Sequence, residues 1–161
     1  WNFVMVTDKK KLADMADVVS GKYNQFPLKN SKLAENVKNQ VDWYSTFFKD
    51  APALLALSME KYESVWEKGT DLSHEEINEM RNYPDIQSAG ACIQNLLLAA
   101  VDMGYGACWL SGPMVAKKEL EVLLGIEGSS HLLSFIAIGK PAKDFQPKKK
   151  ENLAEKLRIV D

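Results

Sequence analysis

The sequence predicts an α+β protein in which helices cover both faces of a central sheet, giving three layers, α/β/α. Two observations support this prediction. Four short apolar runs are typical of strands, and segments with apolar residues at helical spacing separate them. An alternation of strands and helices along one chain is typical of a sheet covered by helices. The same pattern does not determine the order of the strands.

The N-terminal residues predict a strand followed by a helix. Residues 2–7 alternate less than an exposed strand would, so we expect this strand to be covered on both faces. Thr7 or Asp8 can cap the helix that follows. We expect this helix to run to about Ser20, because Gly21 is a natural C-terminal stop.

A second helix and a second strand follow a loop at residues 22–30. The helix begins at Ser31 and has apolar residues at helical spacing as far as Phe48. The sequence Asp50-Ala51-Pro52 ends it, since proline cannot continue a helix. The short apolar run 53–59 then predicts an interior strand.

The longest helix is expected in the second half of the chain. Residues 60–84 are polar and contain one short helix, which Ser73 and Glu76 can begin as a capping box. Residues 85–103 form the long helix, whose apolar side chains cover a broad arc. Residues 105–110 then predict another strand.

The remaining elements are a helix, a strand and a tail. Residues 115–124 predict a helix that Gly125 ends, and residues 132–138 predict a strand. We interpret residues 1–161 as a single domain in which residues 141–161 form a C-terminal arm.

Composition excludes several classes of protein. A chain of 161 residues can bury a sizeable core. Its net charge of −2 gives no indication of the strongly basic surface expected of a nucleic-acid-binding protein. The longest apolar stretch, residues 89–109, is interrupted by Gln94 and Asp102, which argues against a membrane span. Cys92 and Cys108 are not a CxxC pair, so we expect buried free thiols in a cytoplasmic protein.

Several motifs in a fixed order resemble the flavin-dependent nitroreductase family. They are AGACIQNLLLAA at residues 89–100, GYGACW at 104–109 and WLSGP at 109–113. The opening Trp1-Asn2-Phe3-Val4 and the segment IGKPA at 138–142 also match, so the resemblance covers the whole chain. It implies a nitroreductase-like fold with a central mixed sheet. It also implies an intertwined homodimer with FMN at the interface.

The resemblance places the flavin ring at the bend after the third predicted strand. It implies that Ser111 and Gly112 present main-chain N–H groups to flavin N5 and O4, with Trp109 and Leu110 lining the ring. Backbone donors can stabilise charge on a ring without transferring a proton, and small residues let the main chain approach a flat ring. The alternative is a Gly-Pro turn beside a core tryptophan.

Three further residues are weaker candidates for flavin contacts. By resemblance, Lys148 and Lys150 bind the FMN phosphate, although a solvated basic turn is the alternative. Ser88 lies where some relatives place a polar side chain near the flavin, but a serine in a helix is more often simply tolerated. We interpret Cys108 as a buried, inert cysteine rather than a redox thiol.

The activity implied by the resemblance is transfer of hydride from NADH or NADPH, through flavin N5, to a nitroaromatic, a quinone or a similar small acceptor. FMN supplies the chemistry and NAD(P)H is the co-substrate, so no catalytic side chain or metal is required. We expect the protein to pair with itself and to bind neither nucleic acid nor membranes. The alternatives are a flavin-binding or interaction module without turnover and a structural domain.

The beginning of the chain suggests a missing segment. Trp1 already starts the first predicted strand, and the family carries an arginine-rich segment and a helix before this position. In the family, that segment supplies ligands to the FMN phosphate and ribityl chain. We therefore expect this sequence to lack its natural N-terminal segment.

Overall fold

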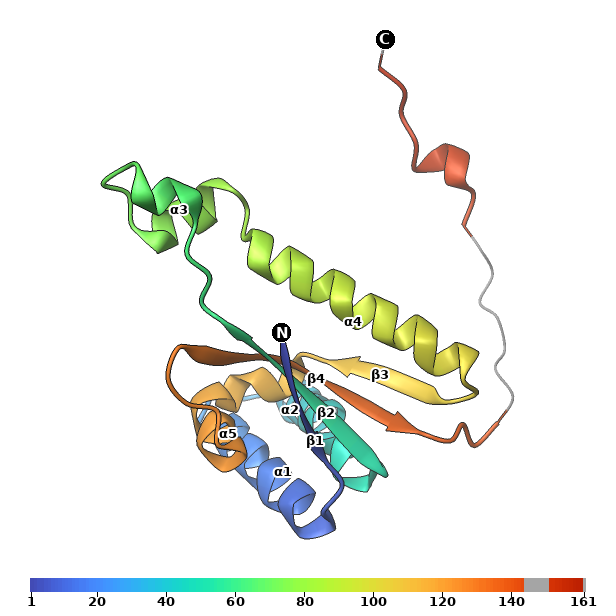
Figure 1. The fold of residues 1–161 in the computed structure, drawn as a ribbon. Helices are drawn as coiled ribbons and strands as arrows, with labels where there is room; N and C mark the ends of the chain where they lie inside the picture. The colour runs from blue at the N-terminus through green and yellow to red at the C-terminus, as the bar shows by residue number, and fades with distance from the viewer. Residues whose placement is uncertain (144–150, 161) are drawn as a thin grey trace.

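Residues 1–143 and 151–160 are described by the computed structural model, and Lys148 and Lys150 lie outside these ranges. Four strands form one sheet, and helices lie on both of its faces (Figure 1). The α+β class and the three-layer arrangement expected from the sequence are confirmed.

The sheet has the strand order β1-β2-β4-β3. Its strands are β1 (Asn2–Val6), β2 (Ala53–Glu60), β3 (Gly106–Leu110) and β4 (Ser130–Gly139). Each pairing between these described strands is antiparallel, so the expected mixed sheet is not observed among them. Two successive helices connect β1 to β2. The chain therefore re-enters the sheet at the end where it left, whereas a single crossover helix would have made the strands parallel.

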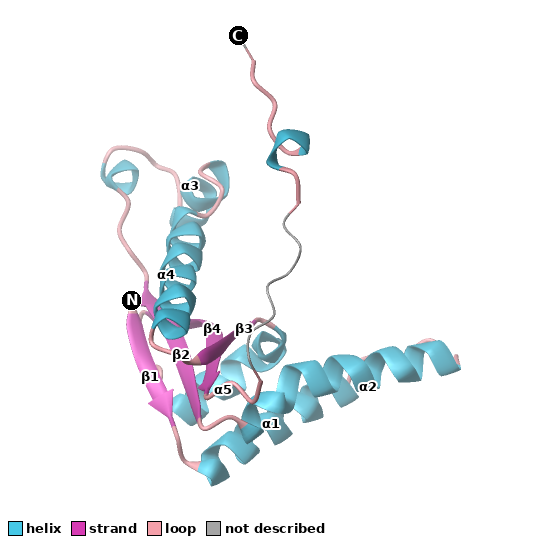
Figure 2. Ribbon diagram, turned by 90° about the vertical axis from the view of Figure 1, so that its right-hand side faces the viewer, coloured by secondary structure: helices cyan, strands magenta, loops and turns pink. Residues whose placement is uncertain are grey.

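Helices cover the two faces unequally. On one face, α1 (Lys9–Asn24) and α5 (Lys117–Leu124) pack against the sheet, while α2 (Lys32–Thr46) packs on α1 and extends away from the sheet (Figure 2). On the other face lies α4 (Pro84–Asp102), preceded by the short α3 (His74–Met80). Four 3-10 segments complete the described structure: η1 (Phe47–Asp50), η2 (Val65–Lys68), η3 (Gly112–Ala116) and η4 (Leu153–Glu155).

Two apolar clusters form the core, one on each face of the sheet. The cluster under α1 and α5 includes Leu12, Met15, Phe48 and Phe135, and the two phenylalanine rings stack with centroids 6.2 Å apart. The cluster under α4 includes Leu57, Ala89, Ile93 and Ile136. In the described part of the chain, none of the helices has the length and hydropathy needed to cross a membrane.

Most of the predicted helix boundaries are confirmed, but α1 is longer than expected. Asp8 caps it by accepting a hydrogen bond from the Lys11 N–H at 2.7 Å. The helix continues through Gly21 to Asn24, so the predicted stop at Ser20 is wrong. A glycine inside a helix costs about 1 kcal/mol relative to alanine, which the packing of the buried Val19 can offset. The caps at Ser31, Ser73 and Gly125 form as predicted.

The prediction that β1 is covered on both faces is wrong for the single chain. Phe3 is 46% exposed and Met5 is 63% exposed, and both side chains lie on the α4 side of this edge strand. The cause is the position of α4, which packs over β3 and β4 at the other side of the sheet. The opposite face of β1 is covered, since Val4 and Val6 pack in the α1 cluster.

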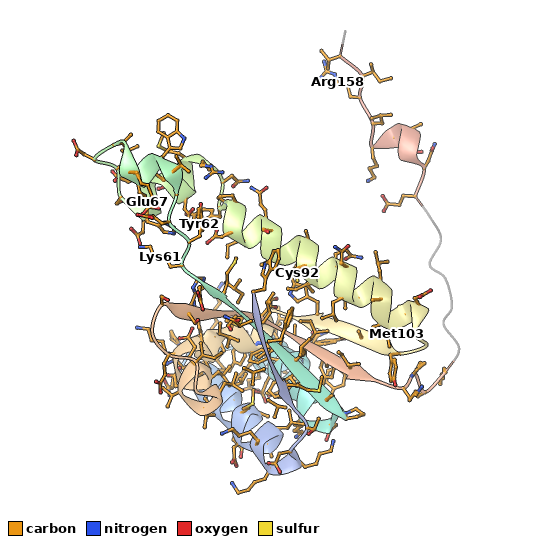
Figure 3. All side chains as sticks on the ribbon, viewed as in Figure 1. Lys61, Tyr62, Glu67, Cys92, Met103 and Arg158 are labelled. Carbon is orange, nitrogen blue, oxygen red and sulfur yellow. The ribbon has the colours of Figure 1, made fainter. Side chains whose placement is uncertain are left out.

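Polar side chains join η2 to α3, and Figure 3 labels two residues of this cluster, Tyr62 and Glu67. Glu67 Oε1 lies 2.8 Å from His74 Nδ1 and accepts a hydrogen bond from the Ser64 N–H at 2.7 Å. Asn78 bridges the Nε2 atom of His74 and the hydroxyl of Tyr62. The bond with His74, followed by the bond from Ser64, holds the pKa of Glu67 below its ordinary value of 4.5.

The lowered pKa of Glu67 predicts acid-sensitive stability in this segment. A carboxylate with a lowered folded-state pKa contributes stability above its unfolded-state pKa and loses it as the pH falls through the folded-state value. As the pH falls from 6 to 3, the Tm of Glu67→Gln should decrease less than the Tm of wild type, because the variant has no carboxylate to protonate at this position. Thermal unfolding measured in about half-unit pH steps gives the two profiles. Glu127→Gln removes an exposed negative charge and serves as the control. Identical pH profiles for wild type and Glu67→Gln would contradict this prediction.

Candidate functional site

The chain bends where β3 leads into η3. Leu110 ends the strand, and Ser111 adopts φ −102° and ψ −24° before Gly112 begins η3. Ser111 is exposed, and its side chain makes no capping hydrogen bond to η3 within the described residues. We call residues 109–113, the WLSGP sequence, the corner. Ser111 is therefore the point at which the corner reaches the surface of the protein.

Two hydroxyl groups lie beneath the corner. The Tyr23 hydroxyl donates to the Gly112 carbonyl oxygen at 3.0 Å, and Ser45 Oγ donates to the Tyr23 hydroxyl oxygen at 3.1 Å. A Cβ atom added to Gly112 would lie 3.1 Å from Ser45 Cβ and would clash with Ser45 Oγ. Glycine is therefore required here by the close approach of α2. The sequence predicts a glycine that lets the main chain approach a flat ring, but Ser45 occupies the space where a side chain of residue 112 would lie.

Trp109 and Leu110 point to opposite faces of the sheet, because successive residues of a strand alternate. Trp109 is 45% exposed on the α4 side, where its Nε1 donates to Ser134 Oγ at 2.5 Å. Ser134 Oγ in turn donates to the Leu110 carbonyl oxygen at 2.9 Å. Leu110 is only 5% exposed and packs in the α1 cluster. Its side chain supports the corner from inside, whereas the Trp109 ring remains accessible.

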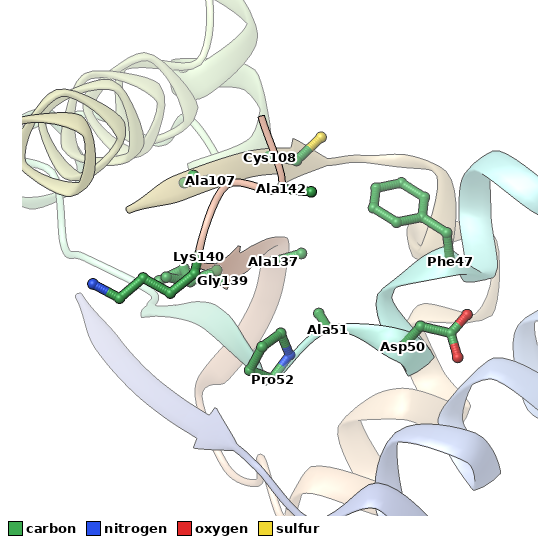
Figure 4. A pocket seen from close by; sticks show the side chains of 12 residues that line it. Phe47, Asp50, Ala51, Pro52, Ala107, Cys108, Ala137, Gly139, Lys140 and Ala142 are labelled. Atoms are coloured by element: carbon green, nitrogen blue, oxygen red, sulfur yellow. The ribbon is translucent and has the colours of Figure 1, made fainter. Parts of the chain in front are cut away.

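A groove of about 550 Å³ runs beside β3, between this strand, the end of β4 and η1 (Figure 4). Small residues make up much of its lining, among them Gly106, Ala107 and Ala137. Phe47 provides an aromatic wall, and the charged side chains of Asp50 and Lys140 lie at opposite ends of the view. On β3 the groove is lined by residues 106–108, which precede the corner in the same strand.

Cys108 also lines this groove. Both cysteines are free, as expected, but Cys108 is exposed and Cys92 is half-buried, so the predicted burial of these thiols is wrong. The cause is the edge position of β3, on which Cys108 faces the groove instead of a packed helix.

The other candidate residues are not brought to the corner. Ser88 is exposed on α4, where it lines a second cavity of about 290 Å³ together with Trp1, Met59 and Tyr62. Lys148 and Lys150 lie outside the described residues. Within the described chain, the structure therefore assembles only residues 109–112 of the predicted set.

Two residues of this site were missed by sequence reasoning. Tyr23 falls in the segment expected to be a loop, and Ser45 falls within a predicted helix without any polar motif around it. Both contact Gly112 across long sequence separations. A pattern of local spacing contains no signal for such contacts.

Comparison with known proteins agrees with the sequence resemblance. The chain matches the Nitroreductase family over residues 1–140. It is 28% identical over 83 residues to "Putative NAD(P)H nitroreductase YfhC" of Bacillus subtilis (strain 168), and this match covers 52% of the chain and 43% of that protein. The match thus spans less than half the length of that curated relative.

Two solved structures show the same fold over the full chain. A BluB-like flavoprotein from Clostridium difficile 630 is 26% identical with a TM-score of 0.82, covering 100% of this chain and 80% of that one. A nitroreductase with bound FMN from Bacteroides fragilis NCTC 9343 is 20% identical with a TM-score of 0.62, covering 100% of this chain and 76% of that one. Because the family match extends over residues 1–140, most of the sequence, the chain belongs to the Nitroreductase family.

Proposed function

We propose that the protein is an FMN-dependent oxidoreductase that uses NADH or NADPH to reduce a small acceptor such as a nitroaromatic or a quinone. Family membership supports the class of reaction, and the name of YfhC supports NAD(P)H as the co-substrate. The FMN in the Bacteroides fragilis structure supports the cofactor. The observation in this chain that supports the proposal most is the exposed corner at the end of β3, the strand whose first residues line the groove.

The residues present fit a planar ring with a polar edge. Glycine and alanine side chains leave room along β3, and Phe47 offers an aromatic surface. Such a combination of apolar walls and a few fixed polar groups is typical of cofactor sites. At the corner, the N–H groups of Ser111 and Gly112 would be the polar partners of the ring edge. Trp109 would border the ring with its exposed indole, and Leu110 would contribute through its main chain.

The chain's own residues would act by holding and orienting. When bound, FMN supplies the hydride chemistry through its N5 atom. Fixed N–H donors stabilise negative charge without giving up a proton, so the corner needs no general base. The support from Tyr23 and Ser45 beneath the corner is consistent with this role, because a donor is most effective when it does not have to move.

Lys148 and Lys150 are proposed to bind the FMN phosphate. Replacing both with alanine should raise the Kd for FMN about 10- to 100-fold at low ionic strength, the effect of losing one or two charged hydrogen bonds. The variant should also show a flatter salt dependence, because salt screens the attraction that it has lost. Equilibrium dialysis of FMN at several salt concentrations measures both effects.

The matched control for the phosphate prediction is the double variant Lys29→Ala and Lys32→Ala. It removes two exposed positive charges at the start of α2. FMN affinity and salt dependence should remain those of wild type. If the Lys148 and Lys150 variant behaved in the same way as this control, other groups would bind the phosphate.

We infer that the protein forms a homodimer with the flavin at the interface. Large apolar side chains are exposed on two helices of the single chain, a feature typical of interaction surfaces. They are Val41, Trp43 and Tyr44 on α2, Leu98 and Val101 on α4, and Met103 directly after α4. Ser88 lies away from the corner, so a contact with flavin would require the second subunit.

The two free cysteines support a reducing compartment, and we place the protein in the cytoplasm.

The visible spectrum under anaerobic conditions tests this function. We expect the purified protein to show the absorption bands of bound FMN, to bleach on addition of NADH or NADPH, and to recover when a quinone is added. A yellow protein that neither nucleotide bleaches would instead be a flavin-binding module without turnover. A protein that remains colourless after incubation with FMN would contradict the flavoprotein assignment.

A further inference from the structure

We propose that Tyr23 is a positioning residue, whose hydroxyl holds the Ser111–Gly112 main chain in the orientation that the flavin ring requires. This inference rests on the proposed function. It adds a residue from α1, far from the corner in sequence, to the group that determines how the site works.

The first support is the chain of hydrogen bonds below the corner. The Tyr23 hydroxyl donates its one proton to the Gly112 carbonyl, and its oxygen accepts a proton from Ser45 Oγ. The Tyr23 hydroxyl thus has both a donor and an acceptor role filled. Holding the Gly112 carbonyl restricts rotation at this glycine, the residue type with the greatest backbone freedom.

The second support is that the next residue is also fixed. Pro113 is fully buried, so the chain is held immediately after Gly112. The φ angle of Pro113 is fixed by its ring. Because proline has no main-chain N–H, Pro113 offers no donor of its own that could take the place of the Tyr23 hydroxyl. The Gly112 carbonyl belongs to the peptide plane shared with Pro113, so rotation about Gly112 is the movement that would turn the Gly112 N–H relative to this held plane, and Tyr23 opposes it.

The third support is that the Tyr23 ring itself is held in place. Its edge contacts the Phe26 ring, with centroids 5.8 Å apart. The preceding residue, Lys22, pairs with Glu119 of α5 at 2.6 Å. Both contacts exist because α1 continues past Gly21 for another turn. This extension of the helix places the hydroxyl under the corner.

The test compares Tyr23→Phe with Ser20→Ala. The first substitution removes only the hydroxyl from the corner. The second removes a hydroxyl hydrogen bond of 2.7 Å between Ser20 and Asp42, which also joins α1 to α2 but lies outside the corner. A general loosening of the two helices would therefore affect both variants alike.

Two measurements are made on each variant. In the FMN-free protein, the NMR order parameter of the Gly112 amide should fall from about 0.85 to below about 0.6 in Tyr23→Phe. In the FMN-loaded protein, the anaerobic rate of flavin reduction at saturating NAD(P)H should fall about tenfold. The KM for NAD(P)H should stay the same, because the nucleotide's contacts are not changed. Ser20→Ala should match wild type in each measurement.

The outcomes separate this inference from the proposed function. An unchanged order parameter, or an unchanged reduction rate, in Tyr23→Phe would overturn the role of Tyr23 while wild type remained an active flavoprotein. Equal losses in Tyr23→Phe and Ser20→Ala would overturn it too, since they would indicate a structural effect. If wild type itself were not reduced by NAD(P)H, the proposed function would fail, and with it the flavin role of Tyr23.

Discussion

Gly112→Ala will slow flavin reduction about 100-fold and lower the free energy of unfolding by about 1–3 kcal/mol. The added methyl group would clash with Ser45 Oγ and lie 3.1 Å from Ser45 Cβ. Rotating Ser45 Oγ away would break its bond to Tyr23, and the Cβ atom would still remain. The corner therefore has to move, and a displacement of about 1 Å at a reacting group can cost two orders of magnitude in rate.

Two further variants make the Gly112 prediction specific. Gly90→Ala is the control, because its new Cβ would lie at an ordinary contact distance of 3.6 Å from Trp109 Cη2. Adding Ser45→Gly to Gly112→Ala removes both clashing atoms and should restore part of the reduction rate, because the double variant still lacks the Ser45 hydrogen bond to Tyr23. Glycine in α2 also costs about 1 kcal/mol of stability. Stopped-flow reduction and urea unfolding measure the two effects. The clash would be irrelevant if Gly112→Ala behaved like Gly90→Ala.

Ser111→Pro will also slow flavin reduction about 100-fold, the effect found when one fixed donor of this kind is removed. Proline deletes the N–H of Ser111 while leaving the rest of the corner in place. The preceding Leu110 is in a strand, a conformation that a residue before proline prefers. Ser111→Ala keeps the N–H and should reduce at nearly the wild-type rate.

The Ser111 comparison needs a measure of strain, because proline prefers φ near −65 ± 15° and Ser111 has φ −102°. Thermal unfolding and FMN affinity are therefore measured on both variants. A slow Ser111→Pro variant that retains FMN and folds normally supports a lost donor. Equal reduction rates for Ser111→Pro and Ser111→Ala would show that this N–H plays no part.

Local signals in the sequence predicted the elements of this fold. Caps such as Ser31 and Ser73 act on the next three residues, so their positions alone identify where helices begin. The prediction that the first helix ends before Gly21 was wrong, because tertiary packing outweighed the cost of a glycine inside a helix, about 1 kcal/mol relative to alanine. The antiparallel pairing of the described strands was not predicted, because strand direction depends on how the connecting helices return, which no short motif specifies.

The site was predictable only in part. The WLSGP motif located the corner. However, side chains alternate along β3, so Trp109 and Leu110 lie on opposite faces of the sheet. The edge position of the same strand exposed Cys108. Tyr23 and Ser45 were missed because their contacts with Gly112 join α1 and α2 to the corner across long stretches of the sequence. Such contacts arise from packing between elements.

A crystal structure of the FMN-loaded protein tests the central proposal most directly. We predict that the N–H groups of Ser111 and Gly112 lie about 2.7–3.2 Å from N5 or O4 of the flavin, with the ring in the groove beside β3. We also predict that the Tyr23 hydroxyl still contacts the Gly112 carbonyl in that complex. Flavin bound elsewhere, with these two amides facing only protein or solvent, would contradict the account.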